Sequence, residues 1–163
     1  MATRLFSICF CLLLTTTALG QVGSKGCDKL ERTEDKFEGT VRISTPLMNW
    51  YRVDKYIEDG TTRIYLSIRG FGYTASVGEK GVIVLLEDGT KLEWPNEEID
   101  CDINTDGPGF VYSAFIGLND DEIDKLAASK ISDSRLYIYD GLPIMKENAL
   151  ELMQQMGCIR DVN

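Results

Sequence analysis

The stretch that decides the fold reads GVIVLLEDGTKLEW and runs from Gly81 to Trp94. Residues 82–86 are apolar and rich in β-branched side chains, which predicts a strand that is buried on both faces. Asp88 and Gly89 tolerate the positive φ angles of a tight turn, and the residues after them alternate between polar and apolar. The stretch therefore predicts a β-hairpin. Because a solitary hairpin is barely stable in water, other strands must cover it.

Short segments of the same kind recur along the chain and predict strands over residues 37–43, 62–69, 99–103, 110–118 and 135–139. Residues 47–56 fit either a strand or a packed loop. About seven short strands, separated by turn residues at intervals of about ten, are typical of an antiparallel β-sandwich or a partly open barrel.

Two later segments predict helices. Asn119 and Glu122 have the spacing of a capping box, so a helix is expected to begin there and to end near Ser129 or Lys130. A second helix has an apolar stripe at helical spacing, formed by Met145, Ala149, Leu152, Met153 and Met156, and Gly157 is expected to end it. The predicted fold is mainly β (α+β), with a crossover helix and a C-terminal helix added to the sandwich.

The first 20 residues have the order of a secretory signal peptide. Arg4 is followed by an apolar run over residues 5–14 and then by small residues before a cleavage point ahead of Gln21. After this segment the sequence has no apolar run of about 20 residues that could span a bilayer. We therefore expect an exported protein, periplasmic or extracellular. A lipid anchor on Cys27 is a poorer explanation, because residues 24–26 do not match a lipoprotein cleavage site.

Residues 21–36 are polar and show no sustained period, so they predict a polar N-terminal arm. Residues 37–163 then form a single sandwich-like domain. The whole chain has 26 acidic and 17 basic residues and a net charge of −9. This balance disfavours nucleic acid and anionic membrane surfaces as partners, because both are recognised by basic surfaces.

Removal of the signal would leave the cysteines Cys27, Cys101 and Cys158. Any two of them could pair, and the sequence does not choose rigorously between the pairings. The alternation over residues 99–103 places Cys101 on an inward face with Ile99 and Ile103, where it would act as a small hydrophobe. Cys27 and Cys158 lie near the two chain ends, which are often neighbours in a compact domain. We therefore predict a Cys27–Cys158 disulfide.

The chain contains no histidine. This removes the histidine-dependent nucleophile systems and the histidine-containing zinc sites, and the sequence has no phosphate loop or nucleophile elbow either. An enzyme is therefore disfavoured, and a hydrolase that uses two carboxylates is kept as an alternative.

No cofactor is predicted, and a calcium site is the one alternative. Asp102, Asn104 and Asp106 match the first half of a calcium loop, in which oxygen ligands stand at alternate positions. The second half does not match, because Ser113 stands where a bidentate glutamate is expected. A plain turn between two strands explains the same residues and is the preferred interpretation.

Aromatic residues gather in two places, at Trp50 and Tyr51 and at Phe71 and Tyr73. If they are exposed, their rings could stack on sugars or hold a peptide, whereas the alternative is that they fill the core. We predict an exported, non-enzymatic domain that binds a protein, peptide or glycan at the cell envelope. The alternative function is that of an envelope structural or accessory protein acting through a sheet edge or the N-terminal arm.

Residues 78–91 and 112–115, together with the capped helix and the strand after it at 119–138, resemble a group of small exported bacterial β-rich proteins, of the type abundant in Bacteroidetes. These proteins have no assigned activity. The resemblance rests on structural motifs, so it implies export and a β-rich fold and assigns no functional residue.

Overall fold

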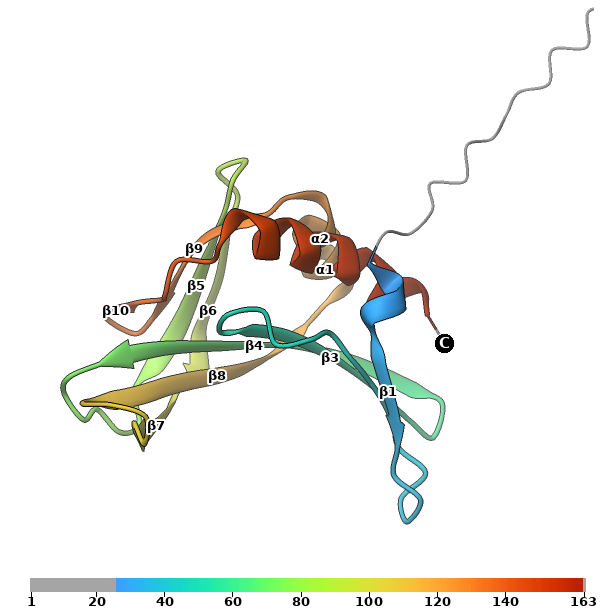
Figure 1. The fold of residues 1–163 in the computed structure, drawn as a ribbon, viewed down its shortest axis with the longest axis horizontal. Helices are drawn as coiled ribbons and strands as arrows, with labels where there is room; N and C mark the ends of the chain where they lie inside the picture. Colours follow the sequence, from blue (N-terminus) through green and yellow to red (C-terminus); the bar gives the residue numbers. More distant parts are fainter. Residues whose placement is uncertain (1–25, 163) are drawn as a thin grey trace, which may run out of the picture.

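The computed structural model describes residues 26–162 and is drawn in Figure 1. Within this range the chain forms ten strands in two antiparallel sheets, together with two α-helices. The six-stranded sheet has the order β1-β2-β3-β4-β8-β7, and the four-stranded sheet has the order β10-β9-β5-β6. The predicted fold class, a sandwich-like and mainly β fold, is confirmed. The predicted signal peptide lies outside the described residues.

The six-stranded sheet consists of β1 (Glu31–Glu34), β2 (Val41–Ser44), β3 (Tyr51–Glu58), β4 (Thr61–Gly72), β7 (Asp100–Ile103) and β8 (Phe110–Leu118). The four-stranded sheet consists of β5 (Lys80–Leu86), β6 (Lys91–Glu98), β9 (Ile131–Leu136) and β10 (Tyr139–Asp140). The helical elements are the 3-10 helix η1 (Cys27–Lys29), α1 (Asp120–Ala128) and α2 (Lys146–Asp161). No helix among these residues is long and apolar enough to cross a bilayer.

The predicted hairpin forms β5 and β6. The inner face of β5 is part of the core, where Val82 and Val84 are fully buried. The opposite side of β5 is not covered, because Leu85 is 38% exposed and Ile83 is half-buried. The prediction of a strand buried on both faces is therefore wrong. The six-stranded sheet covers one side of β5, and the other side meets solvent.

The predicted 99–103 strand corresponds to β7, but its inward face differs from the prediction. Ile99 is buried between β6 and β7, where the chain passes from one sheet to the other. Ile103 is 76% exposed, because β7 is an edge strand whose only strand neighbour among residues 26–162 is β8. Cys101 is a half-buried free thiol.

Turns cut short two of the predicted strands. The first begins at Val41, because the backbone N–H of Phe37 donates to the Asp35 side chain (2.7 Å) in a turn that leaves Phe37 fully exposed. The strand predicted over residues 135–139 ends at Leu136. Tyr137 has a φ of 56°, which turns the chain and leaves Ile138 64% exposed.

The predicted disulfide between Cys27 and Cys158 is confirmed, with the two Cα atoms 5.5 Å apart. It explains two further differences from the sequence-based expectation. The polar arm contains η1 and β1, since its start is tied to α2. The last helix continues past Gly157 to Asp161, because Cys158 holds the disulfide and Ile159 is buried in the core.

The first predicted helix is confirmed, including its capping box. The Asn119 side chain accepts from the backbone N–H of Glu122 (3.0 Å), and the Glu122 carboxylate accepts from the backbone N–H of Asn119 (2.9 Å). The helices α1 and α2 lie on the inner side of the six-stranded sheet, over β3 and β4 (Figure 1). Within the described residues, no helix or second sheet covers the opposite side of that sheet.

Candidate functional site

The candidate site is the uncovered side of the six-stranded sheet. Along β3 and β4 the alternation of the strand directs one set of side chains, such as Val53 and Leu66, into the core. We call the opposite set, with its neighbours on β2 and β8, the outer face: Arg42, Arg52, Asp54, Tyr56, Glu58, Arg63, Tyr65, Ser67, Arg69, Phe71 and Phe115.

Antiparallel pairing aligns these side chains in rows across the strands. Tyr56 stands between Arg42 on β2 and Arg63 on β4. In the next row Asp54 stands opposite Tyr65. Side chains that stand opposite each other on one face of a sheet are close enough to interact. The rows therefore place aromatic rings and charged groups directly beside one another.

Three aromatic rings pack together on this face. The rings of Tyr65 and Phe115 are stacked with their centroids 4.4 Å apart, and Tyr56 meets Tyr65 edge-on at 5.7 Å. Gly117 stands opposite Tyr65, and a Cβ at Gly117 would lie 3.7 Å from the Tyr65 ring. Phe115 is 46% exposed. The three rings thus form an apolar surface that faces solvent, which we call the aromatic cluster.

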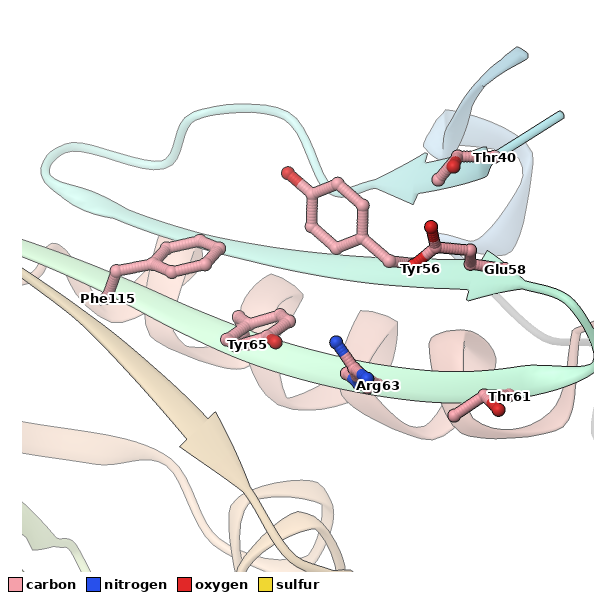
Figure 2. A pocket seen from close by; sticks show the side chains of 7 residues that line it. All are labelled: Thr40, Tyr56, Glu58, Thr61, Arg63, Tyr65 and Phe115. Carbon is pink, nitrogen blue, oxygen red and sulfur yellow. The ribbon is translucent and has the colours of Figure 1, made fainter. Parts of the chain in front are cut away.

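A hollow of about 230 Å³ opens beside the aromatic cluster. Figure 2 shows the side chains that line it, which are Thr40, Tyr56, Glu58, Thr61, Arg63, Tyr65 and Phe115. Its walls combine aromatic rings with hydroxyl groups, one carboxylate and one guanidinium. We refer to it as the first hollow.

A second hollow, of about 450 Å³, lies at the other end of the outer face. Trp50 and Phe71 line it and are in edge-to-face contact, with ring centroids 4.8 Å apart. Asp102, Asn104 and Asp106 line the same hollow. The fold thus brings together two groups of residues that were singled out separately in the sequence.

The other two predicted aromatic residues lie elsewhere. Tyr51 is fully buried, and its hydroxyl lies 2.8 Å from the Oγ of Ser134, so it belongs to the core. Tyr73 is 86% exposed and lies next to Gly109, outside both hollows. Of the four predicted ligand-binding residues, Trp50 and Phe71 therefore share one site.

The loop from Asp102 to Asp106 has the geometry of a turn. The side-chain oxygen of Asn104 accepts from the backbone N–H of Asp106 (3.1 Å), which is the local bond that asparagine makes in turns. Among residues 26–162, no three Cys, Asp or Glu side chains lie close enough together to hold a metal ion. We therefore assign these residues to the wall of the second hollow.

One carboxylate on the outer face is already engaged. Asp54 is 1% exposed and accepts from the Ser44 hydroxyl (2.6 Å), from Arg42 (3.2 Å) and from Arg52 (3.0 Å). The guanidinium of Arg42 also lies over the Tyr56 ring, 5.6 Å from its centroid, at cation–π distance. These contacts fix the orientation of the arginines beside the aromatic cluster.

The aromatic cluster and the arginines were missed by sequence reasoning. A signal was present within single strands: in residues 63–71, apolar residues alternate with polar and aromatic ones, so one face had to be polar. The meeting of Tyr65 and Phe115 depends on the pairing of β4 with β8, which no local pattern specifies. No family model, curated protein or solved structure matches this chain, so the candidate site rests on its geometry.

Proposed function

We propose that this protein is an exported, non-enzymatic domain that binds a glycan on the outer face of its six-stranded sheet. The observation that carries the proposal is the aromatic cluster of Tyr56, Tyr65 and Phe115, in which Phe115 is exposed and the two tyrosines are half-buried. Aromatic side chains dominate binding energetics because each buries a large apolar area, and tyrosine adds a hydroxyl that can pair with a polar ligand. Sugar rings match this chemistry, since they have apolar C–H faces and hydroxyl rims.

A glycan fits the outer face better than a peptide does. Bound peptides commonly add a strand to a free sheet edge or lay a helix in an apolar groove. The two edge strands of the six-stranded sheet, β1 and β7, are each four residues long, and they carry the exposed carboxylates of Glu31 and Glu34 and of Asp100 and Asp102. Short, charged edges of this kind discourage further pairing. The two hollows, in turn, combine aromatic rings with hydroxyls and charges and are not apolar grooves.

Export and location at the cell envelope are part of the proposal. The Cys27–Cys158 disulfide is compatible with an oxidising compartment. The signal-like order of residues 1–20 and the resemblance to small exported bacterial proteins support the same location.

Binding without catalysis is proposed because the outer face lacks an assembled acid–base pair. The chain has no histidine, and Asp54, the buried carboxylate of this face, is held by two arginines and a serine. The carboxylates of the second hollow, Asp102 and Asp106, are exposed. Incubation of the protein with each polysaccharide that it binds should release no new reducing ends.

The test is affinity electrophoresis of the folded, disulfide-bonded protein in gels that contain soluble polysaccharides, neutral and charged. We expect at least one polysaccharide to retard the protein. Substitution of Tyr56→Ala or Phe115→Ala should weaken that retardation about tenfold or more, as expected for anchor residues. Phe37→Ala is the matched control, because Phe37 is fully exposed in the β1–β2 turn and lies outside both hollows.

Two outcomes would overturn the proposal. One is the absence of retardation by every polysaccharide, which would favour a protein or peptide partner. The other is equal retardation of the wild type and the two aromatic variants. Circular dichroism of each variant checks that it is folded before its binding is compared.

A further inference from the structure

Four arginines gather on the outer face of this acidic protein. Arg42, Arg52, Arg63 and Arg69 project from β2, β3 and β4, and the same side of the sheet carries the carboxylates of Asp54, Glu58, Asp100 and Asp102. The whole chain has a net charge of −9. Asp54 is paired with Arg42 and Arg52, so the guanidinium groups that remain for a ligand are those of Arg63 and Arg69.

Two of these arginines have no ionic partner in the described part of the chain. Several basic side chains elsewhere on the surface form ion pairs with carboxylates, as in Lys29–Glu151, Lys130–Glu87 and Arg135–Asp140. Within residues 26–162, Arg63 and Arg69 form no such pair. Both side chains are exposed, so their guanidinium groups are free to bind an anion from solution.

Each free arginine lines one of the two hollows. Arg63 lies in the first hollow beside Tyr56 and Tyr65, and Arg69 lies in the second hollow beside Trp50 and Phe71. Carboxylates also line the hollows, namely Glu58 in the first and Asp102 and Asp106 in the second, but none forms an ion pair with either arginine. A guanidinium thus accompanies aromatic rings at both ends of the outer face.

We infer that the ligand is an anionic glycan, whose carboxylate or sulfate groups are bound by Arg63 and Arg69 while its sugar rings contact the neighbouring aromatic side chains. This inference rests on the proposed function and specifies its ligand class. The planar fork of arginine matches carboxylate and other oxyanions with two parallel hydrogen bonds, which makes such contacts strong and directional.

The separation of the two arginines indicates a polymer. Arg63 and Arg69 lie six residues apart on the same face of β4, which corresponds to about 20 Å along an extended strand. One sugar unit cannot reach both groups. A chain with repeating anionic units can, and it would lie along β4 from one hollow to the other.

The experiment compares polymers that differ in charge on the same backbone. Polygalacturonate is paired with its fully methyl-esterified form, and dextran sulfate is paired with dextran, so the two pairs distinguish carboxylate from sulfate. Titration calorimetry on the folded, disulfide-bonded protein gives the affinity. We expect polygalacturonate or dextran sulfate to bind about ten- to a hundredfold more tightly than its neutral partner, the range of a few charge-assisted hydrogen bonds.

Substitutions then locate the anion contacts. Arg63→Gln and Arg69→Gln should each weaken binding of the charged polymer about tenfold or more and leave binding of the neutral polymer unchanged. Arg63→Lys should restore part of the loss, because it keeps the charge but not the fork. Arg135→Gln is the matched control on β9, outside both hollows, and should have no effect.

The outcomes separate this inference from the proposed function. Equal binding of charged and neutral polymers, with losses only in the aromatic variants, would overturn the anionic ligand and leave glycan binding in place. No binding of any polymer would overturn both. Poly-glutamate binding as tightly as polygalacturonate would overturn the inference, since charge alone would then suffice. An equal loss in Arg135→Gln and Arg63→Gln would overturn it for the same reason.

Discussion

The hydroxyl of Tyr51 on β3 lies 2.8 Å from the Oγ of Ser134 on β9, so this hydrogen bond joins the two sheets inside the core. Both side chains are buried. Burial is also the main reason that the pKa of Tyr51 is raised above its ordinary value of 10.0. The bond is therefore a polar contact in an apolar interior, and its removal should measurably lower the free energy of unfolding.

We expect Tyr51→Phe to lower the free energy of unfolding by about 1 to 2 kcal/mol at pH 8, because the Ser134 hydroxyl loses its buried partner. The effect depends on pH. Since the folded pKa is raised, the unfolded chain releases the Tyr51 proton first, and the wild type loses this contribution to stability as the pH rises above about 10. Urea unfolding of both proteins at pH 8 and near pH 11 measures the difference, which should shrink at the higher pH. A constant difference would contradict the assignment.

Lys55 caps the end of α2 from inside the protein. Its Nζ donates to the backbone carbonyls of Ile159 (3.1 Å) and Arg160 (3.3 Å) and also to that of Val162. Burial lowers the pKa of Lys55, and the nearby Asp161 opposes this shift. Lys55→Met should cost about 1 to 3 kcal/mol, because carbonyls at the helix end lose a charged donor. Amide hydrogen exchange over residues 158–162 should accelerate, whereas Lys36→Met, at an exposed turn, should leave it unchanged.

The disulfide should be the largest single contribution to stability. Cys27 and Cys158 are separated by 131 residues, and closing so long a loop removes about 3 to 5 kcal/mol of chain entropy from the unfolded state in the loop-closure model. We expect the double variant Cys27→Ser/Cys158→Ser to lose that amount in urea unfolding. Cys101→Ser is the control, since Cys101 is a free thiol. A loss below about 1 kcal/mol in the double variant would contradict this account.

Asp54→Asn should change stability and binding in opposite directions. The substitution removes the carboxylate shared by Arg42 and Arg52, which should cost about 2 to 3 kcal/mol of unfolding free energy. It also removes a negative charge from the outer face, so binding of polygalacturonate should become tighter. Asp124→Asn, which removes the exposed partner of Arg160, should cost under about 1 kcal/mol and leave binding unchanged. Weaker polygalacturonate binding by a folded Asp54→Asn protein would count against an anionic ligand.

The features of the fold that follow from local chemistry could be predicted from the sequence. The capping box of Asn119 and Glu122 and the turn at Asp88 and Gly89 depend only on residues close together in the chain, and the hairpin and helix formed as expected. The sequence did not predict correctly which faces of each strand are buried. Val84 and Leu85 are both strongly apolar, yet one is buried and the other exposed, because the number of layers around a strand is a property of the whole fold.

The candidate site was less predictable for a related reason. Trp50 and Phe71 could be named because they are aromatic, but Tyr51 could not be separated from them without knowing which side of β3 faces the core. Tyr65 and Phe115 meet only through the register of β4 against β8. A surface assembled from several strands leaves no motif in any one of them.

The cross-link between η1 and α2 also determines how the domain would bear tension. A pull on the chain ahead of Cys27 is carried through the sulfur atoms into α2, which packs on the core, and so bypasses β1. Without the cross-link the same pull would peel β1 from β2 one hydrogen bond at a time. If the domain were held by the chain ahead of Cys27 and bound a polymer on its outer face, it should therefore unfold under force only when its core unfolds.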